Sequence, residues 1–494
     1  MKKPLNLLAF DLGASNGRAI LGRFDGERMV MQELHRFENN YKVCGDSCCW
    51  DVPYLLSQMK QGFLACKSLG IAEPDCFGID TWGVDYGLLD ENGCLLGLPR
   101  AYRDAKEEDA AAVHETVDFQ TLFSRTGIAS LSFNTLYQLC RRQREQDPAL
   151  QKARTMLLMP DLLGYLLTGE QKAEYTIATT TMLYDPAARD WDRTTIRALK
   201  LPEYIFPELD RAGQLRGRLK PEIAQELGMG QGPFAAVGTH DTASAVAAIP
   251  GEGRFAFCSS GTWSLFGVET EQPILRADVR DAGFSNEGTV QGGFRPLKNI
   301  MGLWLIQECR RDWNAQGKNL SWDAIVAEAE QAEPLRSVID PDDSTFFAGG
   351  NMEEKIRAFC RKTGQPVPET VGQTARCIYE SLALKYRWAL ERLEEIRGSR
   401  IDQLNIVGGG IQNRMLNRMA ADSIDRPVLT GPIEGAALGN LLAQAMALGA
   451  VKDMVELRRI VRNSTPVETY LPQHTAAWDS AYETLLGFLR QKEA

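Results

Sequence analysis

The sequence predicts an α/β protein of two related domains, and two observations support that prediction. At 494 residues the chain exceeds the roughly 250–300 residues that one hydrophobic core usually serves. A strand-turn-strand pattern with a turn of small residues also occurs twice, at 7–21 and again at 255–266. We expect one such hairpin in each domain, with residues 1–249 in the first and 250–494 in the second, because a run of turn formers begins at Pro250.

The first half reads as strands, a helix and a further strand. Three antiparallel strands are predicted at 5–10, 18–24 and 28–37. The helix is predicted to begin after Asp51, a typical N-cap residue, with Pro53 in its first turn, and to end near Gly70. The strand that follows, at 76–80, leads into a segment rich in carboxylates.

The second half repeats this order more loosely. After its hairpin we expect an amphipathic helix, a strand that ends in three glycines, a short strand and an alanine- and leucine-rich helix, at 374–396, 404–407, 427–429 and 435–448. A helix near Gln412 should follow the three glycines, and Gly449 should end the last helix.

The composition limits the class of protein. With 44% hydrophobic and 24% charged residues the chain is an ordinary globular protein, and its net charge of −10 argues against nucleic acid and anionic membranes as partners. The basic start at 1–3 is followed by an apolar run that is interrupted at Asp11, which is too short for a signal peptide. No apolar stretch approaches the ~20 residues that span a bilayer, so we expect a cytoplasmic protein. The oligomeric state is left open, and a monomer is compatible with the sequence.

The cysteines point to neither a disulfide scaffold nor a zinc site. There are 11 of them, dispersed without a C-x-x-C pair, and the cluster at Cys44, Cys48 and Cys49 has no histidine beside it. Cys360 and Cys377 flank a Gly/Pro segment and could pair under oxidation, but in a reducing cytosol we expect two free thiols.

The two hairpin turns suit a polyphosphate. Turns of Gly, Ser, Asn and Thr direct backbone N–H groups and small donors outward. A Walker A loop is absent, because the one Gly-Lys pair, at 317–318, is followed by Asn319. The three glycines at 408–410 suggest a dinucleotide-binding fingerprint, but Asn413 leaves it incomplete, so a dinucleotide-dependent oxidoreductase stays a distant alternative.

Four motifs in register resemble those of one enzyme family. They are Asp11 to Arg18, Gly238 to Ser244, Ser259 to Trp263 and Val407 to Gly410. In this order and spacing they resemble the FGGY carbohydrate kinases, which are members of the actin and hexokinase superfamily. The resemblance implies two ribonuclease-H-like domains with an interdomain cleft, and a kinase that uses ATP and Mg²⁺. An ATP-driven chaperone of the same superfamily would need a peptide-binding domain, for which the tail after residue 450 is too short.

Further segments narrow the resemblance to one branch of the family. They are Asp80 to Gly87, Ala101 to Asp104, Asn134 to Leu139 and Lys298 to Leu305. These are more similar to the kinases of L-rhamnulose than to those of xylulose, glycerol or gluconate. The resemblance implies phosphorylation of L-rhamnulose at its 1-hydroxyl in rhamnose catabolism, with L-fuculose and D-xylulose as alternative ketoses.

Two carboxylates are candidates for the chemistry. Asp241 follows an apolar stretch at 233–237 and can accept the proton of a sugar hydroxyl, the role that the resemblance also implies. Its alternative reading is a helix N-cap. Asp11 ends the first strand beside the phosphate turn, and we interpret it as a Mg²⁺ ligand, direct or through water, with a turn-stabilising Asp as the alternative.

The remaining candidates bind the two substrates. The nucleotide-binding residues are expected to be Ala14, Ser15, Asn16, Gly17, Arg18, Thr262, Gln307, Gly408, Gly409 and Gly410. The sugar-binding residues are expected to be Trp82, Gly83, His240, Asp241, Thr242 and Asn299, with Asp80 and Asp85 as further partners for hydroxyls. Trp82 could instead be a core aromatic, and His240 a structural hydrogen-bonding residue. Tyr102, Arg103 and Asp104 match the family without a role that the sequence assigns.

Overall fold

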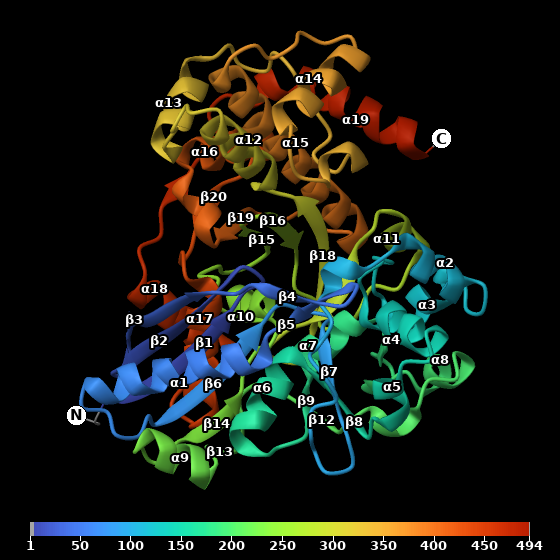
Figure 1. Cartoon of the computed structure of the whole chain (residues 1–494). Helices are drawn as coiled ribbons and strands as arrows, with labels where there is room; N and C mark the ends of the chain where they lie inside the picture. Colours follow the sequence, from blue (N-terminus) through green and yellow to red (C-terminus); the bar gives the residue numbers. More distant parts are fainter. Residues whose placement is uncertain (1–3, 494) are drawn as a thin grey trace. The chain divides into compact units, whose positions relative to one another are not determined.

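The computed structural model describes residues 4–493, so the basic start at 1–3 lies outside it. The chain folds into two compact units. The first unit takes the chain as far as Ala248 and two later segments, Glu269–Pro296 and Glu434–Thr465. The second unit takes Ile249–Val268, Leu297–Ile433 and the chain from Pro466 onward. Figure 1 labels the elements of both units.

The first unit is built on a six-stranded sheet. Its strands, in the order β13-β14-β6-β1-β2-β3, are Gln214–Arg218, Pro233–Ala236, Cys76–Thr81, Leu5–Leu12, Asn16–Phe24 and Met29–Glu38. Strands β1, β2 and β3 are antiparallel neighbours, as the sequence predicts, whereas β14, β6 and β1 run parallel. The parallel part matters for the site, because the carboxyl ends of parallel strands meet at one edge of a sheet.

Helices cover both faces of this sheet. On one face α1 (Val52–Ser68) packs against Leu8 and Phe10 of β1; as predicted, it is capped by Asp51, whose side chain accepts from the backbone N–H of Tyr54. On the other face α17 (Gly435–Ala447) packs against Leu7 and Ala9. Side chains that alternate along β1 therefore serve two layers of core.

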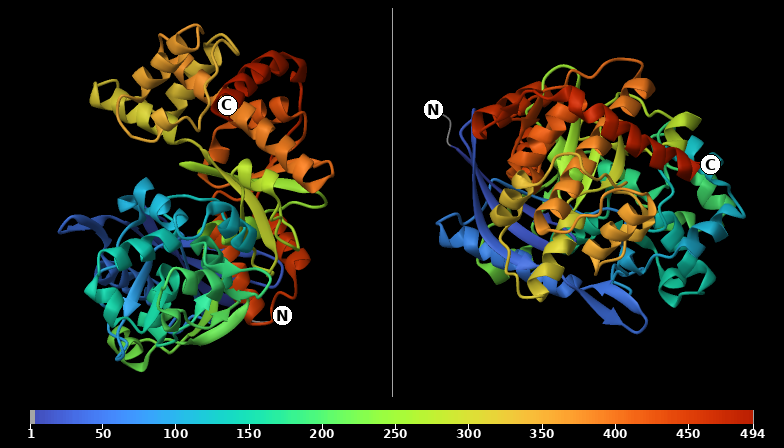
Figure 2. Two further views of the ribbon diagram at one scale, coloured as in Figure 1. Left: turned by 90° about the vertical axis from the view of Figure 1, so that its right-hand side faces the viewer. Right: turned by 90° about the horizontal axis from the view of Figure 1, so that it is seen from above.

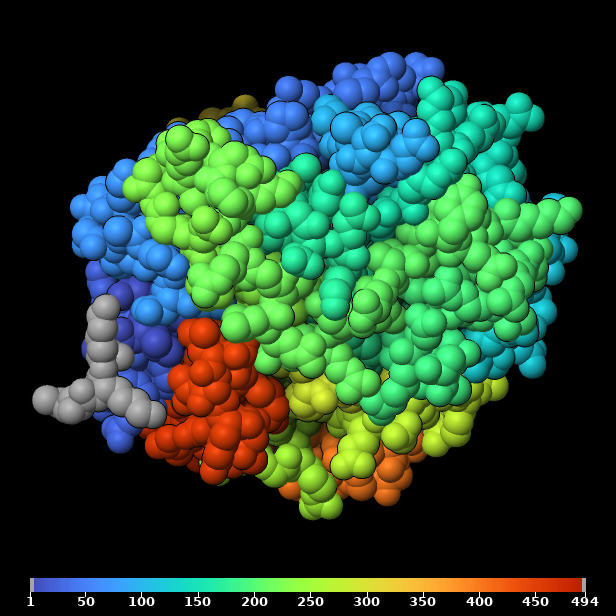
Figure 3. All heavy atoms as spheres, turned by 90° about the horizontal axis from the view of Figure 1, so that it is seen from below, coloured from blue at the N-terminus to red at the C-terminus, as the bar shows by residue number. Residues whose placement is uncertain are grey.

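Helix α17 approaches the sheet together with α10 (Asp241–Ala247) and α18 (Met454–Ser464). A Cβ at Gly439 would overlap the backbone carbonyl of Ser244, so this glycine lets α17 and α10 lie in direct backbone contact. The predicted end of α17 is confirmed, since Gly449 has φ 68°. Figure 3 shows the orange-red 434–465 segment beside blue atoms of the N-terminal part.

A mostly helical region is inserted between β6 and β13. Its longer elements are β7 (Tyr86–Leu89), α2 (Glu107–His114), α3 (Phe119–Thr126), α4 (Thr135–Arg144), β8 (Thr155–Leu158), α6 (Met159–Thr168) and α8 (Arg193–Ala198). The later strand β17 (Ser285–Gly288) contacts this region, because Ser285 Oγ accepts from the N–H of Ala129 at 3.0 Å. The segment 269–296 thereby belongs to the first unit.

The second unit is built mainly on a seven-stranded sheet in the order β17-β18-β16-β15-β19-β20-β21. After β17 these strands are Phe294–Met301, Trp263–Gly267, Phe255–Ser260, Gln403–Val407, Val428–Thr430 and Thr469–Tyr470. The helices of this unit, yellow to red in Figure 2, are α12 (Trp304–Ala315), α13 (Trp322–Gln331), α14 (Met352–Lys362), α15 (Val371–Arg397), α16 (Arg414–Ile424) and α19 (Asp479–Glu493). The predicted hairpin, long helix and following strands are confirmed.

The two sheets share a plan. In each, the first hairpin strand pairs antiparallel with the second and parallel with a later strand, as β1 does with β2 and β6, and β15 with β16 and β19. The repeat seen in the sequence is therefore a repeat of topology. Within residues 4–493, every helix is too short or too polar to cross a bilayer.

Candidate active site

The first hairpin turn is small and tightly fixed. The N–H of Gly13 donates to the carbonyl of Asn16 at 2.8 Å, and the side-chain amide of Asn39 donates to the carbonyl of Gly13 at 2.8 Å. Ser15 and Asn16 are exposed at the tip. A Cβ at Gly17 would overlap the ring of Phe37, so this glycine serves packing against β3. Exposed donors on a rigid turn fit a phosphate cradle.

Arg18 is held between two carboxylates in the first unit. Its Nη2 lies 2.7 Å from Asp11 Oδ2, and its Nη1 pairs with Glu434, the residue before α17. Burial lowers the pKa of Arg18, but the two carboxylates outweigh it, so its pKa is raised. Sequence reasoning missed Glu434, because nothing in its local pattern links it to a residue 416 positions earlier.

Carboxylates gather where the parallel strands end. Asp11 on β1 lies directly opposite Asp80 on β6, and the N–H of Thr81 donates to the carbonyl of Thr239 at 2.9 Å. Asp80 is fully buried and accepts from the side-chain amide of Asn440 at 2.6 Å. Burial, and then the neighbouring Asp11, raise the pKa of Asp80 well above its usual value. Full burial leaves Asp80 inaccessible to a sugar, so the interpretation of Asp80 as a sugar contact is wrong.

Asp241 opens α10 at the same edge of the sheet. It is the first helical residue, and His240 occupies the N-cap position, so the N-cap alternative is wrong. Its Oδ1 accepts from the N–H of Thr242 at 2.5 Å, and its side chain is 31% exposed. Burial raises its pKa, His240 opposes the rise and Asp11 adds to it. A half-buried carboxylate with one oxygen held in place can accept a proton from a bound hydroxyl.

Asp85 supports the predicted sugar side from within the core. Its carboxylate accepts from Trp50 Nε1 at 2.6 Å, from Trp82 Nε1 at 3.0 Å and from Gln138 Nε2 at 3.1 Å. Because Asp85 is buried and its oxygens are occupied, it orients Trp82, and the expectation that it contacts hydroxyls is wrong. Trp82 packs against Trp50 with ring centroids 4.2 Å apart, a partner that the sequence did not reveal.

The chain after Trp82 is constrained. A Cβ at Gly83 would lie 3.3 Å from the side chain of Thr180, which leaves little room for a larger residue. Val84 has φ 68°, a left-handed conformation that is strained for a β-branched residue. Strain of this kind concentrates at functional sites, which fits the prediction that Gly83 approaches a ligand.

The family-matched segment at 102–104 braces the β4–β5 hairpin (Tyr41–Cys44 and Ser47–Trp50). Asp104 accepts from the N–H of Cys48 at 2.6 Å, and the guanidinium of Arg103 lies 5.8 Å from the ring centre of Tyr41. Arg103 and Asp104 also line a polar hollow of about 770 Å³ in this part of the first unit.

In the second unit, the second hairpin presents Thr262 beside Gln307. The hydroxyl of Thr262 donates to Gln307 Oε1 at 3.2 Å, and Thr262 is exposed. On the next strand, Asn299 is partly buried, and its Oδ1 is a buried acceptor without a hydrogen-bond partner among the described residues. The structure thus pairs two predicted nucleotide residues within this unit.

The three glycines differ in what requires them. Gly408 has φ 90°, and a Cβ there would lie 2.8 Å from the carbonyl of Ser260. A Cβ at Gly410 would overlap the side chain of Ser260. Nothing lies within 4 Å of a Cβ at Gly409, so this residue borders open space where a flat ring could rest.

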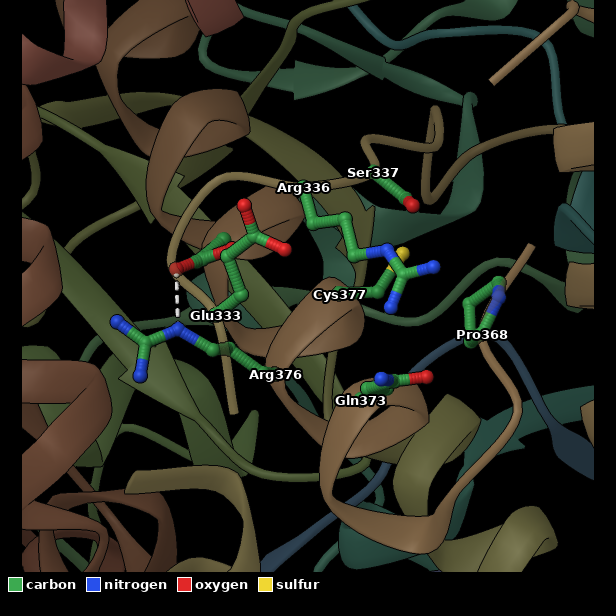
Figure 4. A pocket seen from close by; sticks show the side chains of 8 residues that line it. Glu333, Arg336, Ser337, Pro368, Gln373, Arg376 and Cys377 are labelled. Carbon is green, nitrogen blue, oxygen red and sulfur yellow. Dashed lines mark hydrogen bonds and ion pairs between the residues drawn. The ribbon is translucent and has the colours of Figure 1, made fainter. Parts of the chain in front are cut away.

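A separate small pocket of about 10 Å³ lies along α15 in the second unit. It is lined by Glu333, Arg336, Ser337, Pro368, Gln373, Arg376, Cys377 and Glu380, as Figure 4 shows. Its volume is no more than one water needs, and none of the predicted site residues lines it. All 11 cysteines are free thiols, and within the described residues no group of three His, Cys, Asp or Glu side chains could hold a metal.

Comparison with known proteins identifies the family. The N-terminal domain model of the FGGY family of carbohydrate kinases matches residues 6–248, and the C-terminal domain model matches 256–448. The chain belongs to the FGGY family of carbohydrate kinases. The kinase activity expected from the motifs is therefore confirmed at the level of the family.

Relatives and solved structures agree with this assignment. The FGGY kinase is 42% identical to a rhamnulokinase of Bacteroides thetaiotaomicron over 97% of this chain and 98% of that one. It is 38% identical to a rhamnulokinase of Bacillus subtilis over 94% and 95%. Its fold matches a xylulose kinase from Lactobacillus acidophilus, with a TM-score of 0.81, 14% identity and coverage of 99% and 98%. It also matches a Plasmodium falciparum glycerol kinase with ADP, with a TM-score of 0.77, 15% identity and coverage of 98% and 98%. The predicted fold class is confirmed.

Proposed function

We propose that this FGGY kinase transfers the γ-phosphoryl group of ATP to the 1-hydroxyl of L-rhamnulose, a step of rhamnose catabolism. The observation that carries the reaction is the position of Asp241, a half-buried carboxylate at the edge where three parallel strands end. The choice of sugar is supported by rhamnulokinases that are 37–42% identical along almost the whole chain.

In this proposal Asp241 takes the proton of the attacking hydroxyl. Phosphoryl transfer requires little activation of the nucleophile, so positioning and one proton acceptor suffice. Trp82 and Gly83 shape the sugar side, with His240, Thr242 and Asn299 as hydrogen-bonding partners. The turn from Ala14 to Arg18 binds phosphates from the first domain (1–249), whereas Thr262, Gln307 and the glycines at 408–410 bind the nucleotide from the second (250–494).

We assign Asp11 as the protein ligand of Mg²⁺. The charge of Asp11 raises the pKa of both Asp80 and Asp241, and carboxylates gathered in this way favour a bound cation. Mg²⁺ uses one or two carboxylates and keeps waters and phosphate oxygens as its other ligands, so a larger protein cluster is not required. When bound, the ion would neutralise charge on the phosphates. We place the reaction in the cytoplasm, where ATP is available.

The test is an assay of ADP release with L-rhamnulose, L-fuculose and D-xylulose in the presence of Mg²⁺. Each buried polar group left unpaired by a wrong epimer costs roughly 1–3 kcal/mol, so two mismatches give L-rhamnulose at least about a tenfold advantage in kcat/KM. Equal efficiencies, or a preference for D-xylulose, would overturn the sugar and leave the kinase assignment in place. Absorbance with NAD checks the oxidoreductase alternative.

A further inference from the structure

A buried ion pair lies beside His240, the residue before Asp241. Arg295 of β18 is completely buried, and its Nη2 donates to Glu287 Oε2 of β17 at 2.7 Å. The same Nη2 lies 2.6 Å from His240 Nδ1. Glu287 and Arg295 come from the 269–296 segment, which folds with the first unit, so the pair and His240 lie in one compact body.

This contact determines which ring nitrogen of His240 carries the proton. A guanidinium group has five N–H donors and no acceptor. Arg295 Nη2 lies 2.6 Å from Nδ1, so Nδ1 must offer a lone pair to accept its hydrogen bond. A proton on Nδ1 would instead make the N–H of the ring and the N–H of the guanidinium point at each other. A ring with protons on both nitrogens would bring the same two N–H groups together. The neutral ring then carries its proton on Nε2.

Glu287 offers the competing arrangement. Its Oε2 also lies 3.2 Å from His240 Nδ1, close enough to accept a proton from that nitrogen. Without Arg295, the Nδ1–H form would gain this carboxylate as an acceptor. The guanidinium group, placed between the two, is therefore what selects the Nε2–H form.

The selected form faces the candidate base. His240 Nε2 lies 3.5 Å from Asp241 Oδ1, so an N–H there turns its positive end toward the carboxylate. A bare Nε2 would turn a lone pair toward it. The other charged or titratable groups near these residues are Asp11, Asp80, Tyr102, Glu174 and Glu269, of which four are carboxyl groups, and an N–H donor is the partner that such surroundings favour.

We propose that Arg295, braced by Glu287, is a positioning residue that keeps His240 in its neutral Nε2–H form and so makes it a hydrogen-bond donor toward Asp241 and any sugar hydroxyl bound there. Arg295 acts through His240 and needs no contact with substrate. A hydroxyl that meets Nε2 must then accept a hydrogen bond and can pass its own proton to Asp241. The consequence for turnover rests on the proposed function, whereas the protonation of His240 does not.

The first test reads the ring nitrogens of His240 by NMR. The chain has only 4 histidines, so labelling with ¹⁵N-histidine gives a small set of ring signals, and a His240→Asn sample assigns the one of interest. Protonated and bare nitrogens differ in ¹⁵N chemical shift, and couplings to the ring C–H groups tell Nδ1 from Nε2. We expect a bare Nδ1 and a protonated Nε2 in the wild-type enzyme without substrate. A protonated Nδ1 would overturn the proposal, whatever sugar the enzyme uses.

The second test uses variants of Arg295. Arg295→Met should move the proton of His240 to Nδ1. Loss of the hydrogen bond from Nε2 to the sugar should then lower kcat/KM about tenfold. Without an N–H facing it, Asp241 should hold its proton more tightly, so the acidic limb of the pH profile should shift to higher pH. Arg295→Lys keeps the charge and a donor group, and it should restore part of each effect. Arg216→Lys is the matched control, because Arg216 is also buried in the first unit, paired with Asp161 at 2.6 Å.

The control should lower stability without moving the His240 signals or the acidic limb. If Arg295→Met keeps the wild-type protonation of His240 and an unmoved acidic limb, the proposal fails. If Arg295→Met does not fold, Arg295→Lys and the wild-type spectrum decide the question between them.

Discussion

Trp82 and Asp85 form a hydrogen bond inside the core, from indole Nε1 to Oδ2 at 3.0 Å. The bond fixes the orientation of Trp82, a buried aromatic that we predict to border the sugar, because the same carboxylate also holds Trp50 and the N–H of Tyr102. A charge buried among neutral donors is expensive, and burial raises the pKa of Asp85 to about 6.

Asp85 therefore gives the protein a pH-dependent stability. Its pKa in the folded state, about 6, lies above the unfolded value of roughly 3.9, so between these pH values the folded protein holds the extra proton. The free energy of unfolding should fall as pH rises through this window, by about 3 kcal/mol relative to Asp85→Asn. Urea unfolding of both proteins at several pH values between 4 and 7 measures the difference. A constant difference across this range would contradict the prediction.

Asp241→Asn tests the proposed base. The variant keeps the shape of the side chain and loses the proton acceptor, so turnover should fall by ~10²–10⁴ while nucleotide affinity stays unchanged. Single-turnover measurements with L-rhamnulose and ADP titrations give the two quantities. Retention of more than about a third of wild-type turnover would exclude Asp241 as the base.

Gly409→Ala and Gly410→Ala form a matched pair in the glycine turn. Alanine at 409 has nothing within 4 Å, so it should leave stability unchanged and raise the KM for ATP if a flat ring lies on this turn. Alanine at 410 overlaps Ser260 and should cost about 1–3 kcal/mol of stability. Thermal unfolding and ATP kinetics separate the two. An unaltered KM in the soluble, stable Gly409→Ala variant would place the adenine elsewhere.

Glu434→Gln tests whether the ion pair with Arg18 competes with phosphate binding. The Glu434 side chain is 34% exposed, so the pair is worth no more than about 1 kcal/mol, and its loss should lower the KM for ATP up to about fivefold. Glu226→Gln, which breaks an exposed pair with Lys60, is the control. A higher KM in Glu434→Gln would mean that Glu434 orients Arg18 for the nucleotide.

Thr262→Val tests the second hairpin. The hydroxyl donates to Gln307 in the absence of nucleotide, and a turn of this donor to a phosphate would be worth ~1.5–3 kcal/mol in the transition state. We expect kcat/KM for ATP to fall by the factor that this loss of transition-state stabilisation gives, about tenfold for each 1.4 kcal/mol. The free energy of unfolding should stay unchanged, because Thr262 is exposed. Unchanged kinetics would remove Thr262 from the nucleotide site.

Local patterns predicted most of the elements, because they depend on neighbours in sequence. The turn at 13–16, the cap at Asp51 and the hairpin at 255–266 are all encoded within a few residues. The position of Asp241 at a strand edge also followed from an apolar run that ends before a helix. For such features sequence reasoning was sufficient.

Pairings between residues far apart in the chain could not be predicted from the sequence. The return of 434–465 to the first unit, the partner of Arg18 and the contact between Arg295 and His240 depend on packing between segments that no local pattern connects. Asp80 and Asp85 look like ligands in the sequence, and only their complete burial reveals that they are supports. Among carboxylates near a strand end, the degree of burial thus distinguishes supporting residues from candidate ligands.

The late segment 434–465 also has a consequence for biosynthesis. Ribosomes add about 5–20 residues per second, so the strand that carries Leu7 and Ala9 leaves the ribosome on the order of tens of seconds before α17 exists to cover it. During that interval an apolar face of the nascent sheet is open to chaperones and to other chains. The parts of the second unit at 249–268 and 297–433 are translated within this interval, so the first unit is complete only when translation is nearly finished.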